Sequence, residues 1–160
     1  MVFRRLRVLD ARGVTMLELL VVLVVVAVLA TLGFPSFLTY LRAARVKAAA
    51  EEFATIVNGA RQLAIARNVN VCVSLAGNQA RYLVNASAAC GGGTTFTGAM
   101  TRADGTIPLS NNMEISGTTA NVVFTSLGAA TPAGTYTVRD PETNQTLSVV
   151  IAASGRVRVQ

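Results

Sequence analysis

The sequence predicts an α+β protein, in which a long N-terminal helix with a transmembrane half and an amphipathic half packs on a small antiparallel β-sandwich-like head. Three patterns indicate this fold. An uncharged run occupies Leu19–Leu41, apolar residues recur at helical spacing through Val46–Ala64, and short alternating runs separated by turn residues fill the chain from Val69 onward. A chain of 160 residues is long enough for one modest domain with an appendage, and too short for two ordinary domains.

The composition excludes several classes of protein. Hydrophobic residues make up 52% of the chain and charged residues only 14%, which excludes an intrinsically disordered protein. The absence of histidine excludes a Ser-His-Asp hydrolase, a histidine metal site and a histidine general base. Two cysteines cannot build a four-ligand structural zinc site. We therefore expect neither an enzyme nor a cofactor or metal, because no Ser-His, metal or nucleotide-binding constellation is present.

The first element is a basic segment followed by an apolar helix. Residues 1–13 carry four arginines against one aspartate. The 23 residues of Leu19–Leu41 contain no charge, and as a helix they would extend about 35 Å, beyond the roughly 30 Å of a bilayer's hydrocarbon core. The run therefore predicts one transmembrane helix, and the preceding arginines predict that the N-terminus lies on the cytoplasmic side.

Two other interpretations of this run explain less of it. A secretory signal peptide has a shorter apolar core and a small-x-small cleavage site, which is missing here before the next helical segment. A plain signal anchor explains the length but leaves Glu18 unexplained, because a carboxylate near the start of a membrane span costs on the order of a few kcal/mol unless it is paired.

The residues around the start of the run resemble the class III signal of type IV pilins and pseudopilins: Gly13, then Val-Thr-Met-Leu-Glu, then the apolar stretch. The resemblance implies that a prepilin peptidase cuts after Gly13 and that the new N-terminus, Val14, is methylated, although the family usually has Phe or Met there. It also implies that Glu18 meets the N-terminal amine of a neighbouring subunit during assembly, which lowers the desolvation cost of both charges. Pro35 matches a proline that kinks or melts the family's helix by removing a backbone donor.

The second half of the helix is amphipathic. Its apolar residues fall on one side and are expected to pack on the head: Val46, Ala49, Ala50, Phe53, Ile56, Val57, Ala60, Leu63 and Ala64. Asn68 and Asn70 are expected to end the helix. The predicted organisation is a cleaved leader, a transmembrane and filament-core helix, an amphipathic helix and a β-rich head, over residues 1–13, 14–35, 36–68 and 69–160.

The head is predicted to be made of short strands. A hairpin is expected from residues 71–73 and 82–84, joined around Gly77-Asn78-Gln79. Residues 87–105 are polar and rich in glycine, but no strand-then-helix context surrounds them, so a surface loop is expected rather than a phosphate-binding loop. Turn residues separate the remaining predicted strands, at 107–109, 113–115, 122–125, 136–139, 147–151 and 157–159.

The last 40 residues resemble the C-terminal half of the GspH/FimT family, which contains minor pseudopilins of type II secretion and minor pilins of type IV pili. The resemblance rests on residues 122–125, Gly128, and residues 134–138, 149–151 and 155–159. It implies a non-enzymatic subunit that crosses the bacterial inner membrane once, with its head in the periplasm. After processing by prepilin peptidase it would join other pilins or pseudopilins in a pilus or pseudopilus through its N-terminal helix.

Two cysteines lie near the predicted hairpin, Cys72 in its first strand and Cys90 just after its second. Outside the cytoplasmic membrane disulfides form and persist. A bridge would close a loop of about 19 residues and stabilise the head by roughly 3 kcal/mol. The alternative is a pair of free buried thiols, and a catalytic cysteine is not expected without a histidine partner.

The C-terminal tail carries the candidate binding residues. Arg156 and Arg158 are two apart in a predicted strand, so their side chains share one face and could bind neighbouring phosphates. In FimT-like minor pilins a Gly-Arg-x-Arg tail is associated with DNA binding during natural transformation, and Gly155-Arg156-Val157-Arg158 matches it. The resemblance is closest to that group.

Two alternatives stay open for this tail. The arginines could instead protect an edge strand from aggregation, and the protein could be a GspH-type minor pseudopilin of a type II secretion system that binds protein partners.

Cleavage of the leader would remove four arginines and one aspartate and leave a net charge of +3 from 10 basic and 7 acidic residues. The sequence does not place the other head arginines, Arg81, Arg102 and Arg139, relative to the tail.

Overall fold

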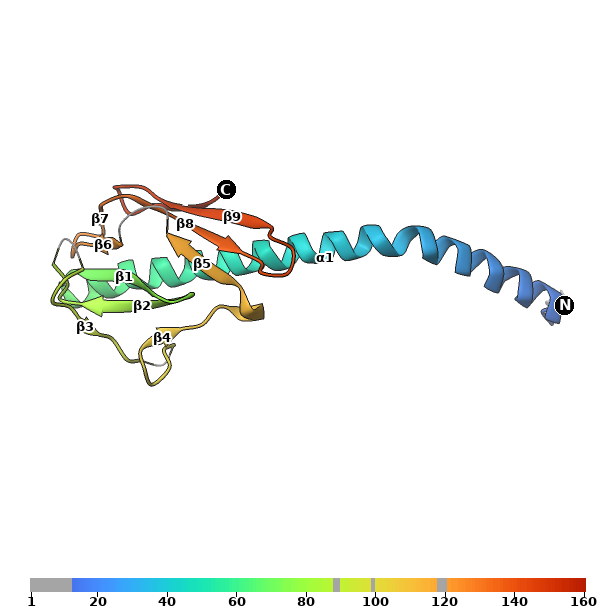
Figure 1. Ribbon diagram of the computed structural model, residues 1–160, viewed down its shortest axis with the longest axis horizontal. Coiled ribbons are helices and arrows are strands. Elements are labelled where there is room, and N and C mark those ends of the chain that lie inside the picture. The colour runs from blue at the N-terminus through green and yellow to red at the C-terminus, as the bar shows by residue number, and fades with distance from the viewer. Residues whose placement is uncertain (1–12, 88–89, 99, 118–120) are drawn as a thin grey trace, which may run out of the picture. The chain divides into compact units, whose positions relative to one another are not determined.

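The computed structural model describes residues 13–87, 90–98, 100–117 and 121–160 (Figure 1). The first twelve residues of the predicted leader lie outside the described part. The chain divides into two compact units, Met1–Tyr40 and Leu41–Gln160. The single long helix, α1 (Met16–Arg67), begins in the first unit and ends in the second.

The first unit is an apolar helix with little covering its side chains. Thr15 caps the helix: the backbone N–H of Glu18 donates to the Thr15 hydroxyl at 3.2 Å, which satisfies one of the free donors of the first turn. Among the side chains that the structure describes in this unit, the large apolar ones, from Val14 at 71% to Tyr40 at 71%, are more than half exposed except that of Leu38. A helix that is apolar on all sides is stable only where lipid or other protein covers it.

No single straight helix in the described part of the chain meets the length and hydropathy of a membrane span. The consecutive segments Met16–Thr31 and Ser36–Arg67, with a bend between them, meet these criteria together by length and composition alone.

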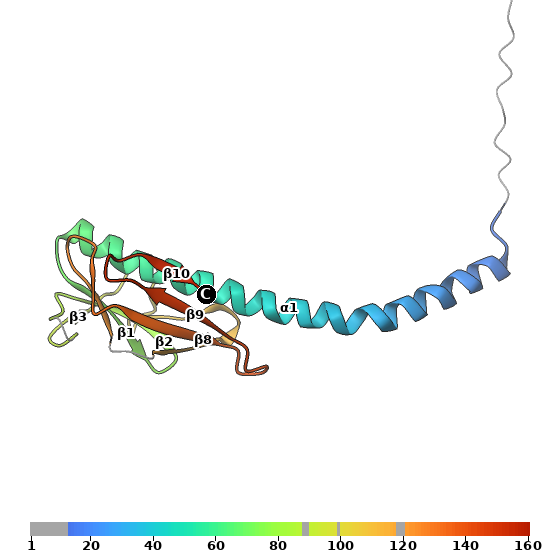
Figure 2. The same cartoon turned by 90° about the horizontal axis from the view of Figure 1, so that it is seen from above.

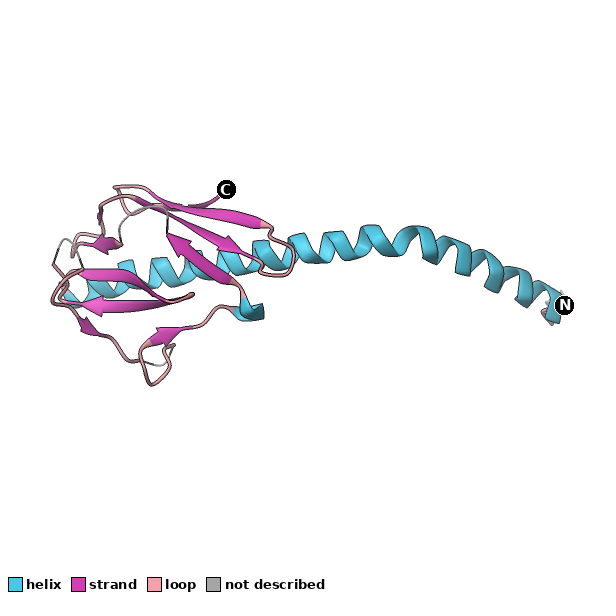
Figure 3. Cartoon of the chain, viewed as in Figure 1, coloured by secondary structure: helices cyan, strands magenta, loops and turns pink. Residues whose placement is uncertain are grey.

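The second unit combines the C-terminal part of α1 with two antiparallel sheets (Figure 3). The larger sheet has the order β3-β2-β1-β6-β7, with β4 pairing separately with β2, and the smaller has the order β10-β9-β8-β5. A 3₁₀ turn at Ser110–Asn112 precedes β5. The strands are β1 (Val71–Ala76), β2 (Gln79–Val84), β3 (Thr94–Thr95), β4 (Thr106–Ile107), β5 (Glu114–Gly117), β6 (Val122–Phe124), β7 (Ala130–Thr131), β8 (Gly134–Arg139), β9 (Thr146–Ile151) and β10 (Val157–Val159).

The core of this unit lies between α1 and the sheets, which run along one side of the helix (Figure 2). Every predicted member of the helix's apolar stripe is buried except Leu63, which is partly exposed. At the centre the rings of Phe53 and Tyr136 meet edge to face, with their centroids 5.2 Å apart.

Tyr136 also links the two sheets. Its hydroxyl donates to the Val73 carbonyl at 3.0 Å and accepts from the Val122 N–H at 3.1 Å. Tyr136 belongs to β8 of the smaller sheet, whereas Val73 and Val122 belong to the larger one. Burial raises the pKa of Tyr136, so the hydroxyl stays protonated and can donate.

A second buried tyrosine forms a hydrogen bond between the larger sheet and the helix. The Tyr82 hydroxyl donates to the Ile56 carbonyl of α1 at 2.5 Å, and burial raises its pKa. A Cβ atom at position 59 would lie 3.0 Å from this hydroxyl. Gly59 therefore leaves the space that the tyrosine occupies.

The observed elements follow the predicted ones closely, with differences at their ends. The predicted hairpin is present and longer, as β1 and β2, and α1 ends at Arg67, immediately before Asn68 with its positive φ of 54°. Two strands of two residues each, β3 and β7, were not predicted, because two residues show no alternation. The first of them lies inside the segment predicted as a surface loop.

Candidate assembly segment and nucleic-acid interface

The predicted cleavage point lies just before the helix. Gly13 and Val14 are exposed and belong to no helix or strand. Among the described residues, none lies within 4 Å of the position that a Cβ atom would take at Gly13.

Glu18 lies in the first turn of α1, three residues after the capping Thr15. Its side chain is exposed among exposed leucines and forms no salt bridge within the described residues. A helix N-terminus favours a negative charge. If the surrounding leucines are covered in an assembly, however, the carboxylate needs a cation to offset its desolvation.

At Pro35 the backbone is helical. The bend in the helix falls between Thr31 and Ser36, the interval that contains Pro35. A proline in this interval removes one helical hydrogen bond, which is a common cause of bending.

Cys72 and Cys90 form a disulfide, with their Cα atoms 5.6 Å apart, and neither cysteine is free. Cys72 is fully buried on β1 in a small cluster with Ala86 and Val123, separate from the main core. The bridge holds the segment after β2 against the sheet. The Cys90 N–H donates to the Ser87 carbonyl at 2.9 Å.

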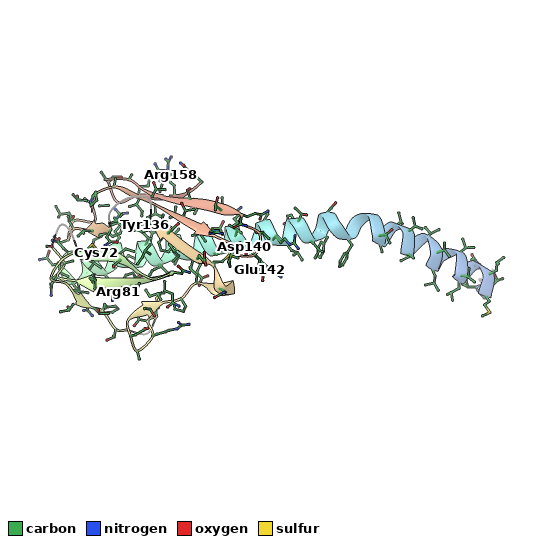
Figure 4. All side chains as sticks on the ribbon, in the orientation of Figure 1. Cys72, Arg81, Tyr136, Asp140, Glu142 and Arg158 are labelled. Carbon is green, nitrogen blue, oxygen red and sulfur yellow. A yellow bond between two sulfur atoms is a disulfide. The ribbon has the colours of Figure 1, made fainter. Side chains whose placement is uncertain are left out.

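The tail arginines lie at an edge of the smaller sheet. In the described part of the chain β10 pairs with β9 alone, with Arg158 opposite Val150. Arg156 and Arg158 are exposed, whereas the alternating Val157 and Val159 are partly buried against the core. The two guanidinium groups therefore project from the same outward face, and Figure 4 shows Arg158 at the margin of the head.

The turn before β10 packs closely against a second turn. Gly155 and Gly128 both have positive φ, 77° and 81°. A Cβ atom at Gly155 would overlap the Gly128 carbonyl oxygen. The Ala130 N–H donates to the Ala153 carbonyl at 2.9 Å, which joins the two turns. The glycine of the Gly-Arg-x-Arg tail is therefore needed for this close approach.

The two turns enclose a third arginine, from α1. The Arg61 Nε atom lies 3.0 Å from the positions that Cβ atoms would take at Gly128 and at Gly155. This atom is buried and has no hydrogen-bond partner among the described residues. Arg61 was not predicted from the sequence, because no local pattern in a helical segment indicates contact with a turn more than 90 residues later.

The acidic side chains of this sheet lie at the other end of the β8–β9 hairpin. Asp140 follows β8 directly, with Glu142 two residues on, and Figure 4 shows the pair away from Arg158. The Thr143 hydroxyl and the Glu142 N–H hold the pKa of Asp140 below its ordinary value, and Arg45 contributes less. The six residues of β9 extend about 20 Å, so these carboxylates are distant from the turn that bears Arg156.

The other head arginines do not join the tail. Arg139 stands at the acidic end of the hairpin, where it faces Glu114 at 3.9 Å and donates through Nε to Asn144 at 3.1 Å. Arg102 donates to Gln79 at 3.3 Å. Arg81 lies on β2 of the other sheet, with its Nε atom buried. The candidate interface therefore comprises Arg156 and Arg158, with Arg61 beside them.

Within the described residues, no group of three or more histidine, cysteine, aspartate or glutamate side chains is arranged to hold a metal ion. A shallow apolar groove lies between the end of α1 and the segment after β3, bordered by Leu63, Tyr82, Phe96 and Met100. The described residues that line it include no aspartate, glutamate, cysteine, lysine or arginine.

Comparison with known proteins agrees with this architecture. Residues 49–155 match the family model described as type II transport protein GspH, and residues 9–34 match the prokaryotic N-terminal methylation motif. No curated protein matches the sequence.

Two solved structures share the fold. One is the type IV minor pilin FimU of Pseudomonas aeruginosa strain PAO1, at 17% identity and a TM-score of 0.50, covering 76% of this chain and 92% of that one. The other is the minor pseudopilin EpsH from the type 2 secretion system of Vibrio cholerae, at 14% identity and a TM-score of 0.54, covering 72% and 96%. The predicted fold class, a long helix packed on an antiparallel head, is confirmed.

Proposed function

The chain belongs to the GspH family and carries the prokaryotic N-terminal methylation motif, and from this premise we propose that it is a FimT-like minor type IV pilin that binds DNA electrostatically during natural transformation. By family and fold it is a minor pilin or pseudopilin, a structural subunit of a type IV pilus or of a type II secretion system. Membership of a type IV pilus rather than a type II secretion system, and DNA as the ligand, are what we propose.

The proposal of DNA binding rests on the two arginines of the C-terminal tail. Arg156, directly before the edge strand β10, and Arg158 within it are both exposed, and no carboxylate among the described residues forms a salt bridge with either. The hairpin's own acids, Asp140 and Glu142, lie at its opposite end. A guanidinium group without an internal ion-pair partner can bind a phosphate in bidentate geometry, because no existing ion pair has to be broken first.

The assembly route follows from the first unit. Prepilin peptidase cuts after Gly13, and Val14 becomes the methylated N-terminus. The exposed apolar helix crosses the inner membrane once, with the head in the periplasm, and then enters the filament core. There the carboxylate of Glu18 pairs with the N-terminal amine of a neighbouring subunit, and the bend near Pro35 adapts the helix to that core.

A second candidate is a GspH-type pseudopilin that binds protein partners. It is favoured by apolar side chains exposed near the same turns: Leu127 is 90% exposed, and Ile65, at 49%, lies beside Gly128. Exposed leucine and isoleucine side chains are more suited to a protein surface than to a phosphate backbone.

DNA binding is tested with the full chain in nonionic detergent, by titration against fluorescent duplex DNA at several salt concentrations. The double variant Arg156→Ala, Arg158→Ala should bind more weakly and flatten the slope of log affinity against log salt by about 1.8, because each phosphate contact contributes about 0.9. Arg139→Ala, at the acidic end, is the matched control and should leave the slope unchanged. Equal binding by the wild type and the double variant would refute the DNA role and favour the pseudopilin.

Processing is tested in a host with active prepilin peptidase. Mass spectrometry of the membrane-extracted protein should find a chain that starts at Val14 with an added methyl group. Gly13→Glu should leave the leader attached, because a bulky charged side chain would occupy the cleavage position. An intact leader on the wild-type protein would contradict the assembly route without affecting the DNA proposal.

A further inference from the structure

We infer that Arg61 of α1 is a third phosphate-binding cation of the tail interface, held beside Arg156 by the two glycine turns; this inference rests on the proposed DNA binding. The resemblance that identifies the tail covers only Gly155 to Arg158. A residue from the helix is brought to this interface by tertiary structure alone.

The geometry places Arg61 close to the tail. Its Nε atom lies 3.0 Å from the Cβ position of Gly155, the residue before Arg156. Adding one Cα–Cβ bond and the 3.8 Å between consecutive Cα atoms places this Nε within about 8 Å of the Arg156 Cα atom. An arginine side chain is almost that long, so the two guanidinium groups can reach the same phosphate or adjacent phosphates of one strand.

The turns determine where the Arg61 side chain can go. A Cβ atom at Gly128 would come within 3.0 Å of Arg61 Nε and within 3.5 Å of its Nη2. Side chains at positions 128 and 155 would therefore displace the guanidinium group. With glycine at both positions, the turns cover Nε, while the residue as a whole stays partly exposed.

The electrostatics also favour an external anion. Arg61 forms no salt bridge in the described part of the chain, and its buried Nε has no hydrogen-bond partner there. A partly buried guanidinium group is weakly screened by salt and water, so it attracts a nearby phosphate more strongly than a fully exposed one does. No internal carboxylate has to be displaced when the phosphate binds.

The test compares Arg61→Gln with Arg45→Gln in the full chain in nonionic detergent, using duplex DNA at several salt concentrations. Arg45 belongs to the same helix, sixteen residues or about 24 Å earlier, and it lies near Asp140 rather than the tail. Arg61→Gln should lower affinity about eight-fold at 0.1 M salt and reduce the salt slope by about 0.9. Arg45→Gln should leave the slope unchanged, and the melting temperatures of both variants show whether the fold is intact.

Arg61→Lys separates a phosphate contact from a packing role. Lysine keeps the charge but not the shape, so the salt slope should be retained if Arg61 contacts phosphate. If Arg61→Gln and Arg45→Gln have equal slopes while the double variant Arg156→Ala, Arg158→Ala still weakens binding, the inference on Arg61 is wrong and the proposed function stands. If the wild-type protein does not bind DNA even at 20 mM salt, both are refuted.

Discussion

Gly155→Ala tests whether the two turns pack as closely as the structure indicates. Alanine at this position would adopt a left-handed backbone, φ 77°, which costs about 1–2 kcal/mol. Its methyl group would also overlap the Gly128 carbonyl oxygen. Relieving that overlap separates the turns and weakens the bond from Ala130 to Ala153, at a further cost of about 2–3 kcal/mol.

Gly77→Ala is the matched control for this variant. Gly77 also has a positive φ, of 61°, but nothing lies within 4 Å of its Cβ position. Gly77→Ala should therefore lower the free energy of unfolding only by the cost of the left-handed backbone, about 1–2 kcal/mol. The difference of about 2–3 kcal/mol corresponds to a melting temperature about 10 °C lower for Gly155→Ala than for Gly77→Ala.

Both variants are measured by thermal unfolding of the full oxidised chain in nonionic detergent, followed by the near-ultraviolet circular dichroism of its tyrosines. The chain has no tryptophan, and two of its three tyrosines, Tyr82 and Tyr136, are buried in the head. Gly155→Ala should also lower DNA affinity without changing any charge, since it displaces Arg61 and Arg156. Melting temperatures within about 2 °C of each other would refute the close packing of the turns.

Three other predictions follow from the assembly segment and the head. Replacing Cys72 and Cys90 with serine should lower the free energy of unfolding by about 3 kcal/mol in urea titrations, and equal urea midpoints would contradict a stabilising role for the bridge. Glu18→Ala should be cleaved normally but enter filaments less, because a neighbour's amine loses its partner; immunoblots of sheared filaments with wild-type levels of the variant would show that the carboxylate is dispensable. Since hydrogen bonds lower the pKa of Asp140, its contribution to stability is present above the ordinary aspartate pKa of about 3.9 and lost as pH falls through the lower folded value. The melting temperature of the wild type should then fall more steeply below about pH 4 than that of Asp140→Asn, and parallel curves would oppose this reasoning.

The sequence by itself was sufficient for the features that depend on neighbours along the chain. The uncharged run Leu19–Leu41 and the apolar spacing of Val46 to Ala64 are local patterns, so α1 and its buried stripe were predictable. The first hairpin was predictable for the same reason, and its Gly77 turn has the backbone expected there. The Cys72–Cys90 bridge was predicted because the head was expected outside the cytoplasmic membrane, with free buried thiols as the alternative, and the disulfide is present.

Only the tertiary structure decided which distant residues meet. Arg61 and Gly155 are 94 positions apart, and they come together because α1 packs against the sheets and two glycine turns remove the side chains that would separate them. The separation of Asp140 from the tail likewise depends on the direction in which β9 runs, not on the number of residues between them. Periodicity reports which face of an element is buried, but contacts between elements depend on how those faces pack, which a single sequence does not encode in any local pattern.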